Sequence, residues 1–203
     1  MRRWIRTALH DCPSQPWANG RGLTQEILAW PQPDDWSVRV SVAQIAQSGP
    51  YSVLPDTKRW HSILKGQVTL HFERTSVALD AQSAPYPFDG SISCECHLVE
   101  GPALAFNTMT RGPFKTTVVR IMTPAQGSLA SMLGLADKDS CVLAGVYAMA
   151  PTQVANDKHK ESIGPDHWIW SDQMTSDQLR ETIVTTDTAL LVVVQATEVS
   201  ETT

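Results

Sequence analysis

The chain has 203 residues, a net charge of −5, and 42% hydrophobic and 18% charged residues, a composition typical of a globular protein with one large domain or two fused small ones. The acidic balance and the lack of any Lys/Arg-rich stripe exclude nucleic acid as an expected partner. No apolar run approaches the roughly 20 residues needed to cross a bilayer, and no signal peptide is visible, so we expect no membrane association.

Short strands separated by Gly and Pro turns run through the whole sequence. The pattern predicts strands over residues 4–9, 23–30, 36–45, 59–64, 67–72, 76–79, 91–99, 116–122, 140–148, 168–170 and 188–199. We expect one turn of helix over 176–180 and loops over 110–115 and 153–166. This indicates an all-β sandwich or barrel, and the similar strand content before and after about residue 110 suits two packed β-halves.

Alternation in two strands leaves the role of several polar residues open. Val38 and its alternate neighbours fall on one face of the strand at 36–45, while Arg39 and Ser41 fall on the other. Either the valine face is the core and Arg39 faces solvent, or Arg39 and Ser41 line a polar lumen. Arg59 and His61 share a face and raise the same question. An arginine in a cleft is a natural partner for a carboxylate, because its planar fork binds two oxygens.

The four cysteines do not form a metal or disulfide pattern. Cys94 and Cys96 lack a second pair at zinc-like spacing, and alternation places both on one strand face as small core residues. We therefore expect free thiols and a reducing, cytoplasmic setting.

Familiar catalytic and cofactor motifs are missing. The six histidines contain no H-x-H pair of the kind that a β-barrel metal site needs, so we expect no metal and no cofactor. There is no G-x-S-x-G elbow, and Cys96 and His97 are strand neighbours that point to opposite faces. The segment 19–22 lacks both the P-loop Lys and the dinucleotide spacing of glycines.

A short polar stretch near the start carries a family resemblance. Residues 17–26, W-A-N-G-R-G-L-T-Q-E, resemble the W-x-N-G-x-G-x-T-x-E signature of the HutD/Ves family. Segments 36–43, 49–56, 87–90 and 101–111 are similar to later family segments in the same order, so the resemblance covers about residues 5–120. The sequence departs from the family pattern at Arg21 and Asp56, where many members have glycine.

The resemblance implies a fold, a ligand and a site. It implies a single cupin-like domain over residues 1–203, a double-stranded β-helix of the bicupin type that lacks the usual cupin metal ligands. The two β-barrel-like halves of this domain would cover approximately 1–110 and 111–203. Members associated with histidine utilisation are thought to bind a formylated glutamate in a regulatory capacity, and the Ves branch is linked to cold and stress response. Carried over by position, the pocket candidates are Trp17, Asn19, Thr24, Glu26, Arg39, Ser41, Arg59, His61, Asn107, Met109 and Arg111.

Structural roles stand beside these functional ones. Asn19 could simply cap its turn, and Glu26 could pair with an arginine to hold the first strands together. We favour ligand binding for Asn19, Arg39, Arg59 and Asn107, because amides and guanidinium groups are costly to bury without partners.

Three functions remain open from the sequence. The leading one is a metal-free protein that binds a small anionic metabolite, with a homodimer as one oligomeric alternative. The second is a metal-free isomerase or lyase that acts on a small carboxylate, with Glu26 or His61 as general base. The third is an interaction module whose outer β-face binds a partner.

Overall fold

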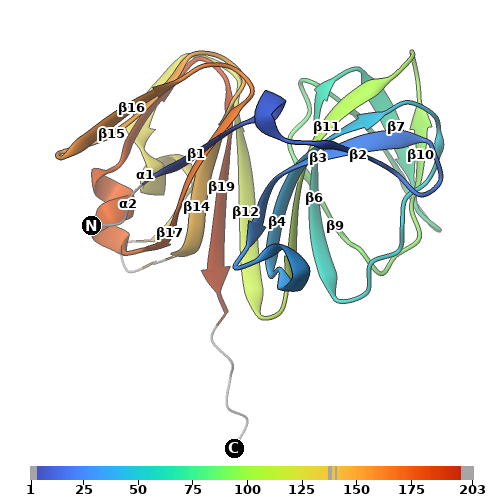
Figure 1. Cartoon of the computed structure of the whole chain (residues 1–203), viewed down its shortest axis with the longest axis horizontal. Coiled ribbons are helices and arrows are strands. Elements are labelled where there is room, and N and C mark those ends of the chain that lie inside the picture. Colours follow the sequence, from blue (N-terminus) through green and yellow to red (C-terminus); the bar gives the residue numbers. More distant parts are fainter. Residues whose placement is uncertain (1–3, 137–138, 140, 198–203) are drawn as a thin grey trace, which may run out of the picture. The chain divides into compact units, whose positions relative to one another are not determined.

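The computed structural model describes residues 4–136, 139 and 141–197. The chain divides into two compact units, which we call the central unit (Asp11–Gly112) and the terminal unit (Met1–His10 with Pro113–Thr203). Both units are built almost entirely from antiparallel strands, as Figure 1 shows, so the all-β prediction is confirmed.

The central unit contains a six-stranded and a four-stranded sheet. The six-stranded sheet has the order β2 (Ser14–Pro16), β3 (Gly22–Trp30), β4 (Val38–Ile45), β11 (Ala103–Arg111), β6 (Thr57–Lys65) and β9 (Tyr86–Asp89). The four-stranded sheet has the order β5 (Gly49–Pro50), β10 (Glu95–Leu98), β7 (Gln67–His71) and β8 (Ser76–Asp80). A 3-10 turn, η2 (Pro33–Asp35), joins β3 to β4.

The core of the central unit explains the cysteine pattern. Cys94 and Cys96 are free, buried and part of one apolar cluster with Ile63, Val68 and Leu70. Burial raises the pKa of Cys94 to about 11, so this thiol stays protonated and behaves as a small apolar side chain. The predicted core role of both cysteines is confirmed.

The terminal unit also has two sheets. Its five-stranded sheet has the order β1 (Ile5–Ala8), β17 (His167–Met174), β14 (Cys141–Ala148), β19 (Ala189–Ala196) and β12 (Phe114–Ile121). Its four-stranded sheet has the order β13 (Ala125–Ser128), β18 (Ile183–Thr186), β15 (Thr152–Asn156) and β16 (His159–Ile163). The 3-10 turn η1 spans Leu9–Asp11.

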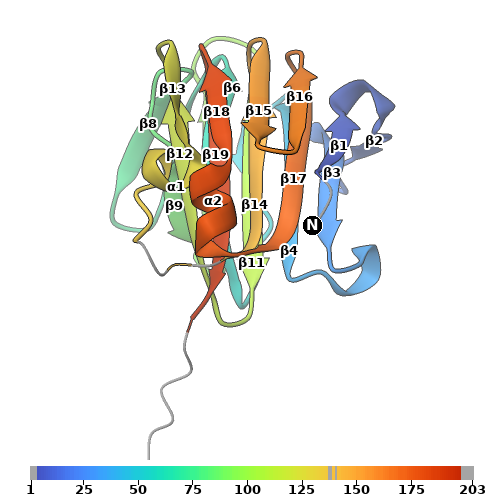
Figure 2. The ribbon, with the colours of Figure 1, turned by 90° about the vertical axis from the view of Figure 1, so that its left-hand side faces the viewer.

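Two short helices, α1 (Leu129–Met132) and α2 (Ser176–Glu181), contact each other in the terminal unit (Figure 2). The predicted helical turn at 176–180 is confirmed as α2, which begins in a capping box. There the Thr175 hydroxyl accepts from the backbone N–H of Gln178, and the Gln178 side chain accepts from that of Thr175. Neither helix is both long and apolar enough to span a membrane, within the described residues.

Apolar side chains fill the interior of the terminal unit. Its core cluster combines Leu129, Val146, Ile169, Leu191 and Val193, each fully or almost fully buried, with other aliphatic residues. The central unit buries Arg59, His61 and Asn107, whereas the buried polar residues described in the terminal unit are serines and threonines.

Two loop predictions were wrong. Residues 153–166 contain all of β15 except its first residue, and all of β16. Residues 110 and 111 end strand β11, so that only Gly112 and Pro113 separate β11 from β12. Strand β16 lies at a sheet edge and four of its five residues are exposed, which gives it the polar composition of a loop. The strand predicted at 91–99 is shorter and covers only Glu95–Leu98.

Candidate ligand-binding site

A cavity of about 290 Å³ lies within the central unit. It is bounded by the start of the unit, by strands β4, β6 and β11, and by the segment that follows β5. Its lining residues are Trp17, Ala18, Asn19, Thr24, Arg39, Ser41, Ala43, Ile45, Pro50, Tyr51, Ser52, Leu54, Arg59, His61, Asn107 and Met109.

Strand register places the polar lining in rows. Strand β11 pairs with β4 on one side and β6 on the other, so Met109 faces Arg39 and Arg59 in one row. Neighbouring strands are about 4.8 Å apart, which puts the Cα atoms of the two arginines roughly 10 Å from each other. Two residues further along, Asn107 faces Ser41 and His61 in the next row.

The opposite face of β4 is buried as well. Val38, Val40 and Val42 are at most 2% exposed, while Arg39 and Ser41 line the cavity on the other face. The valine face is therefore apolar core, and the second alternative holds for the other face, where Arg39 and Ser41 line a polar cavity.

Arg59 is the most unusual side chain in the cavity. The residue is only 7% exposed, yet it forms no ion pair with any described residue. One terminal nitrogen donates weakly to the carbonyl oxygen of Ser52 at 3.5 Å, and the buried Nε has no hydrogen-bond partner in the described part of the chain. Burial lowers the pKa of Arg59, but a guanidinium stays charged in proteins.

Two aromatic rings hold the Arg59 guanidinium. Its central carbon lies 5.2 Å from the ring centroid of Tyr51 and 4.8 Å from that of Phe88. A Cβ at Gly90 would stand 3.3 Å from Arg59 Cδ and 2.8 Å from the carbonyl oxygens of Leu54 and Thr57. Stacking on aromatic rings offsets part of the cost of burying the charge and leaves the edge of the guanidinium plane free to bind.

His61 and Asn107 form a buried hydrogen-bonded pair. His61 Nδ1 lies 2.8 Å from Asn107 Oδ1, and His61 Nε2 lies 3.5 Å from the Tyr51 hydroxyl. Burial is the main reason that the pKa of His61 falls to about 4, and the charge of Arg59 lowers it further against the opposing effect of Asn107. At neutral pH the imidazole is therefore uncharged.

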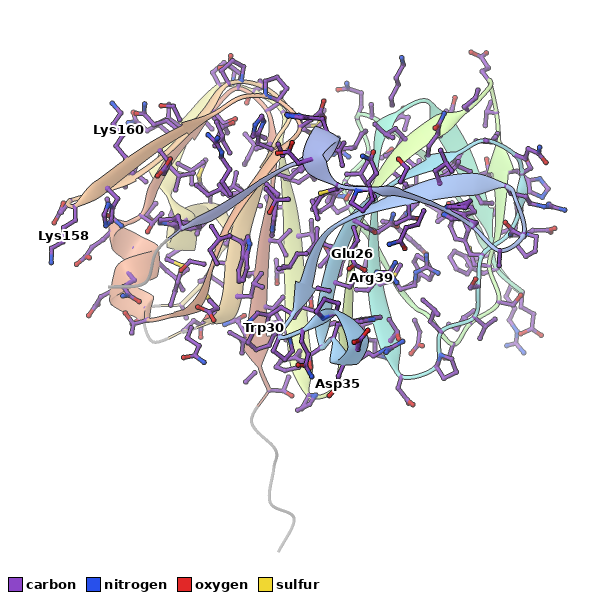
Figure 3. All side chains as sticks on the ribbon, in the orientation of Figure 1. Glu26, Trp30, Asp35, Arg39, Lys158 and Lys160 are labelled. Atoms are coloured by element: carbon purple, nitrogen blue, oxygen red, sulfur yellow. The ribbon has the colours of Figure 1, made fainter. Side chains whose placement is uncertain are left out.

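Arg39 lies nearer to solvent and has a carboxylate partner. Its Nε is 2.8 Å from Glu26 Oε2, and the two side chains, 28% and 27% exposed, lie beside each other in Figure 3. The central carbon of the Arg39 guanidinium is also 5.9 Å from the ring centroid of Trp36. The guanidinium carbon of Arg111 lies 3.9 Å from the same centroid. Glu26 and Arg111 do not line the cavity.

The stretch that carries the family signature forms part of the cavity wall. Trp17 Nε1 donates to Thr24 Oγ1 at 2.7 Å, which fixes the indole ring, and Asn19 Oδ1 accepts from the Arg21 backbone N–H at 3.0 Å. Asn19 also lines the cavity. Gly22 is required here, because a Cβ would stand 2.4 Å from the carbonyl oxygen of Gln44 and 3.0 Å from the Trp17 ring.

The structure brings most of the sequence-predicted site residues together. Those that line the cavity are Trp17, Asn19, Thr24, Arg39, Ser41, Arg59, His61, Asn107 and Met109. Sequence reasoning did not single out Tyr51, Ser52 and Phe88, which hold or contact Arg59. The sequence did contain a signal for them, because Tyr51 and Ser52 lie in the family-like segment 49–56 and Phe88 lies in the family-like segment 87–90.

The donor set of the cavity does not suit a metal ion. Its lining contains one histidine and no carboxylate or thiol, and two arginines add positive charge. Among the described residues, no group of three or more His, Cys, Asp or Glu side chains is arranged to hold a metal. These residues fit an anion better than a cation.

Comparison with known proteins decides the family. The HutD family model matches residues 9–191, which is most of the chain. The chain belongs to the HutD family. The HutD/Ves resemblance inferred from the sequence is therefore confirmed.

Curated relatives of the chain carry the name Ves. The chain is 34% identical over 101 residues to protein Ves from Cronobacter sakazakii, a match covering 49% of this chain and 56% of that protein. It is 29% identical over 154 residues to protein Ves from Escherichia fergusonii, covering 74% of this chain and 78% of that protein. The first of these matches thus spans little more than half the length of the relative.

Solved structures confirm the fold. HutD from Pseudomonas fluorescens SBW25, in a formate condition, superposes with a TM-score of 0.79 at 19% identity over 96% of this chain and 99% of that one. A single-residue variant of oxalate decarboxylase from Bacillus subtilis superposes with a TM-score of 0.61 at 6% identity over 96% of this chain and 77% of that one. The HutD family chain is thus all-β and cupin-like.

Proposed function

We propose that the cavity of the central unit binds a small carboxylate, and that the protein acts as a metabolite-binding regulator rather than as an enzyme. The observation that carries this proposal is the buried guanidinium of Arg59, which has aromatic rings beside it but no carboxylate partner among the described residues. A buried charge without a counterion is costly, and an anionic ligand would supply the missing partner.

The rest of the cavity supports an organic acid rather than a bare inorganic anion. The volume of about 290 Å³ is far larger than one carboxylate needs, and the walls carry Trp17, Ala43, Ile45 and Met109 beside the polar groups. A carboxylate on Arg59 would leave Arg39, roughly 10 Å across the sheet, for a second anionic or polar group of the same ligand.

Family membership suggests which acid to test first. HutD proteins are associated with histidine utilisation, and N-formylglutamate is a small dicarboxylate of suitable size and charge. The Ves branch of the family is linked to cold and stress response, and curated relatives of this chain carry that name, so a stress-related role is the physiological alternative. Both are proposals for this chain, and the ligand-binding step is common to them.

Two observations weigh against acid–base catalysis. Glu26 does not line the cavity and its carboxylate is paired with Arg39 at 2.8 Å. His61 does line the cavity, but its two ring nitrogens already face Asn107 and Tyr51. Neither group is free to take a proton from a substrate carbon without first giving up a partner.

Calorimetric titration with N-formylglutamate, urocanate and glutamate tests the proposal. We expect saturable binding of at least one of these acids to the wild-type protein and loss of that binding in Arg59→Gln. Arg74→Gln is the matched control, because Arg74 is an exposed arginine of the same unit that does not line the cavity. It should bind as the wild type does.

The result that would overturn the proposal is also clear. If none of the three acids binds, or if Arg59→Gln binds as tightly as Arg74→Gln, then the buried guanidinium is not an anion site. Circular dichroism and thermal unfolding of each variant show whether it is folded before it is titrated.

A further inference from the structure

The orientation of the Asn107 amide sets the direction of a short hydrogen-bond chain. Asn107 Nδ2 lies 3.4 Å from the carbonyl oxygen of Ala105, a group that can only accept. The amide nitrogen must therefore face Ala105, and Oδ1 faces His61 Nδ1 at 2.8 Å. Because a carbonyl oxygen accepts, His61 Nδ1 is the nitrogen that carries the proton.

The second nitrogen of His61 is consequently an acceptor. The residue is 2% exposed and lies close to the positive charge of Arg59, so it does not carry a second proton at neutral pH. A bare Nε2 lone pair thus faces the Tyr51 hydroxyl at 3.5 Å. An imidazole nitrogen that can only accept leaves the hydroxyl as the donor of this contact.

The hydroxyl proton of Tyr51 therefore points at His61 and is not available to a ligand. The Cys96 thiol also lies within hydrogen-bonding reach of the hydroxyl, but sulfur is a weaker acceptor than an imidazole nitrogen. With its proton directed at His61, the hydroxyl oxygen can only accept a hydrogen bond from a ligand. Tyr51 lines the same cavity as Arg59, whose guanidinium carbon is 5.2 Å from the Tyr51 ring centroid.

From this arrangement we infer that the cavity selects carboxylates with a hydrogen-bond donor close to the carboxylate, such as α-hydroxy and α-acylamino acids. Arg59 would hold the carboxylate oxygens, and Tyr51 Oη would accept from the neighbouring O–H or N–H of the ligand. Asn107 and His61 act as positioning residues, because they fix the polarity of Tyr51 without needing to touch the ligand. The inference rests on the proposed carboxylate site and adds its selectivity.

Matched pairs of acids test the selectivity directly. Glycolate and propionate have almost the same size and charge, but only glycolate has an α-donor; N-acetylglycine and N-acetylsarcosine form a second pair that differs at the amide N–H. We expect the wild-type protein to bind glycolate and N-acetylglycine, which carry the donor, at least about fivefold more tightly than their partners. This is the effect of one ordinary hydrogen bond.

Two variants connect the preference to the chain of hydrogen bonds. Tyr51→Phe removes the acceptor, so the ratio of glycolate to propionate affinity, and that of N-acetylglycine to N-acetylsarcosine, should fall to about one. His61→Leu keeps the hydroxyl but frees its proton to face the cavity, so the preference should fall there too. Thermal unfolding shows whether each variant is folded. If a variant is not folded, the affinities of the wild-type protein for the paired acids still test the selectivity.

Failure of the selectivity and failure of the site look different. If no acid binds, or if Arg59→Gln binds all four as the wild type does, both the carboxylate site and its selectivity are overturned. If all four acids bind through Arg59 but the pairs do not differ, or if folded Tyr51→Phe keeps the preference, only the selectivity is overturned. A wild-type preference that Tyr51→Phe abolishes supports it.

Discussion

Arg39 and Arg59 flank Met109 in a single row of the six-stranded sheet, so that two guanidinium groups enter one cavity from strands on either side of β11. The two arginine side chains differ in burial and in their partners. Arg39 is half-buried and pairs with Glu26 at 2.8 Å, whereas Arg59 is buried and forms no ion pair with a described residue. The uncompensated charge of the cavity is therefore concentrated at Arg59.

Replacing Arg59 should stabilise the ligand-free protein. In Arg59→Met an apolar chain of similar length replaces a buried charge that has no counterion among the described residues. We therefore expect the free energy of unfolding in low salt to rise by about 1 kcal/mol. Urea unfolding of the wild type and of Arg59→Met, with the exposed Arg74→Met as control, measures the difference. A large loss of stability would mean that stacking on Tyr51 and Phe88 outweighs the cost of burying the charge.

The Glu26–Arg39 pair should tune the affinity for anions. Glu26→Gln removes a carboxylate that competes for Arg39, so we expect N-formylglutamate to bind several-fold more tightly at low salt, with less gain at high salt. Arg39→Gln should weaken binding of the same acid. Titrations at two ionic strengths check both changes, and equal affinities in the two variants would exclude Arg39 from the ligand site.

Stability should depend on pH through His61. Its pKa is about 4 in the folded protein and near 6.5 when unfolded, so between these values the unfolded chain binds the additional proton. Stability therefore rises with pH across this window and falls as pH drops, by about 3 kcal/mol in total from this group. Urea unfolding between pH 7 and pH 5 should show a smaller slope in His61→Gln; an unchanged slope would mean that His61 is not buried and neutral.

Gly90 should tolerate no side chain. A Cβ there would stand 2.8 Å from two carbonyl oxygens and 3.3 Å from Arg59 Cδ, so Gly90→Ala should lose about 1–3 kcal/mol of stability and weaken anion binding. Gly127→Ala is the control, because its Cβ would make ordinary contacts of 3.4 and 3.8 Å with the flexible Met132 side chain. Similar thermal unfolding of both variants would contradict the packing seen around Arg59.

Alternation predicted the strands that are apolar on one face and polar on the other. Strand β4 is such a case, and its two faces could be assigned before the structure was known, although not which one lined a cavity. Strand β11 could not be recognised in this way, because it is buried on both faces and its residues do not alternate. Alternation also did not reveal edge strand β16, for the opposite reason. Four of its five residues face solvent, so it has no apolar face.

The candidate site was predictable where it lies on regular strands. Arg39 with Ser41, and Arg59 with His61, were paired correctly by their spacing of two residues. Tyr51 was missed because it lies outside any strand, where no periodicity indicates its direction; its backbone N–H donates to the carbonyl oxygen of Cys94. The position of Glu26 depends on an irregular register of β3 between Glu26 and Leu28, which sequence spacing does not reveal.

A crystal structure of the protein grown with saturating N-formylglutamate would show whether Arg59 is the anion site. We expect a carboxylate of the ligand within hydrogen-bonding distance of Arg59, at the guanidinium edge that carries Nε, which has no partner among the described residues. We also expect Glu26 to stay outside the cavity. A ligand bound elsewhere on the protein, or a carboxylate held by Arg39 alone with Arg59 still unpaired, would contradict the assignment of the anion site to Arg59.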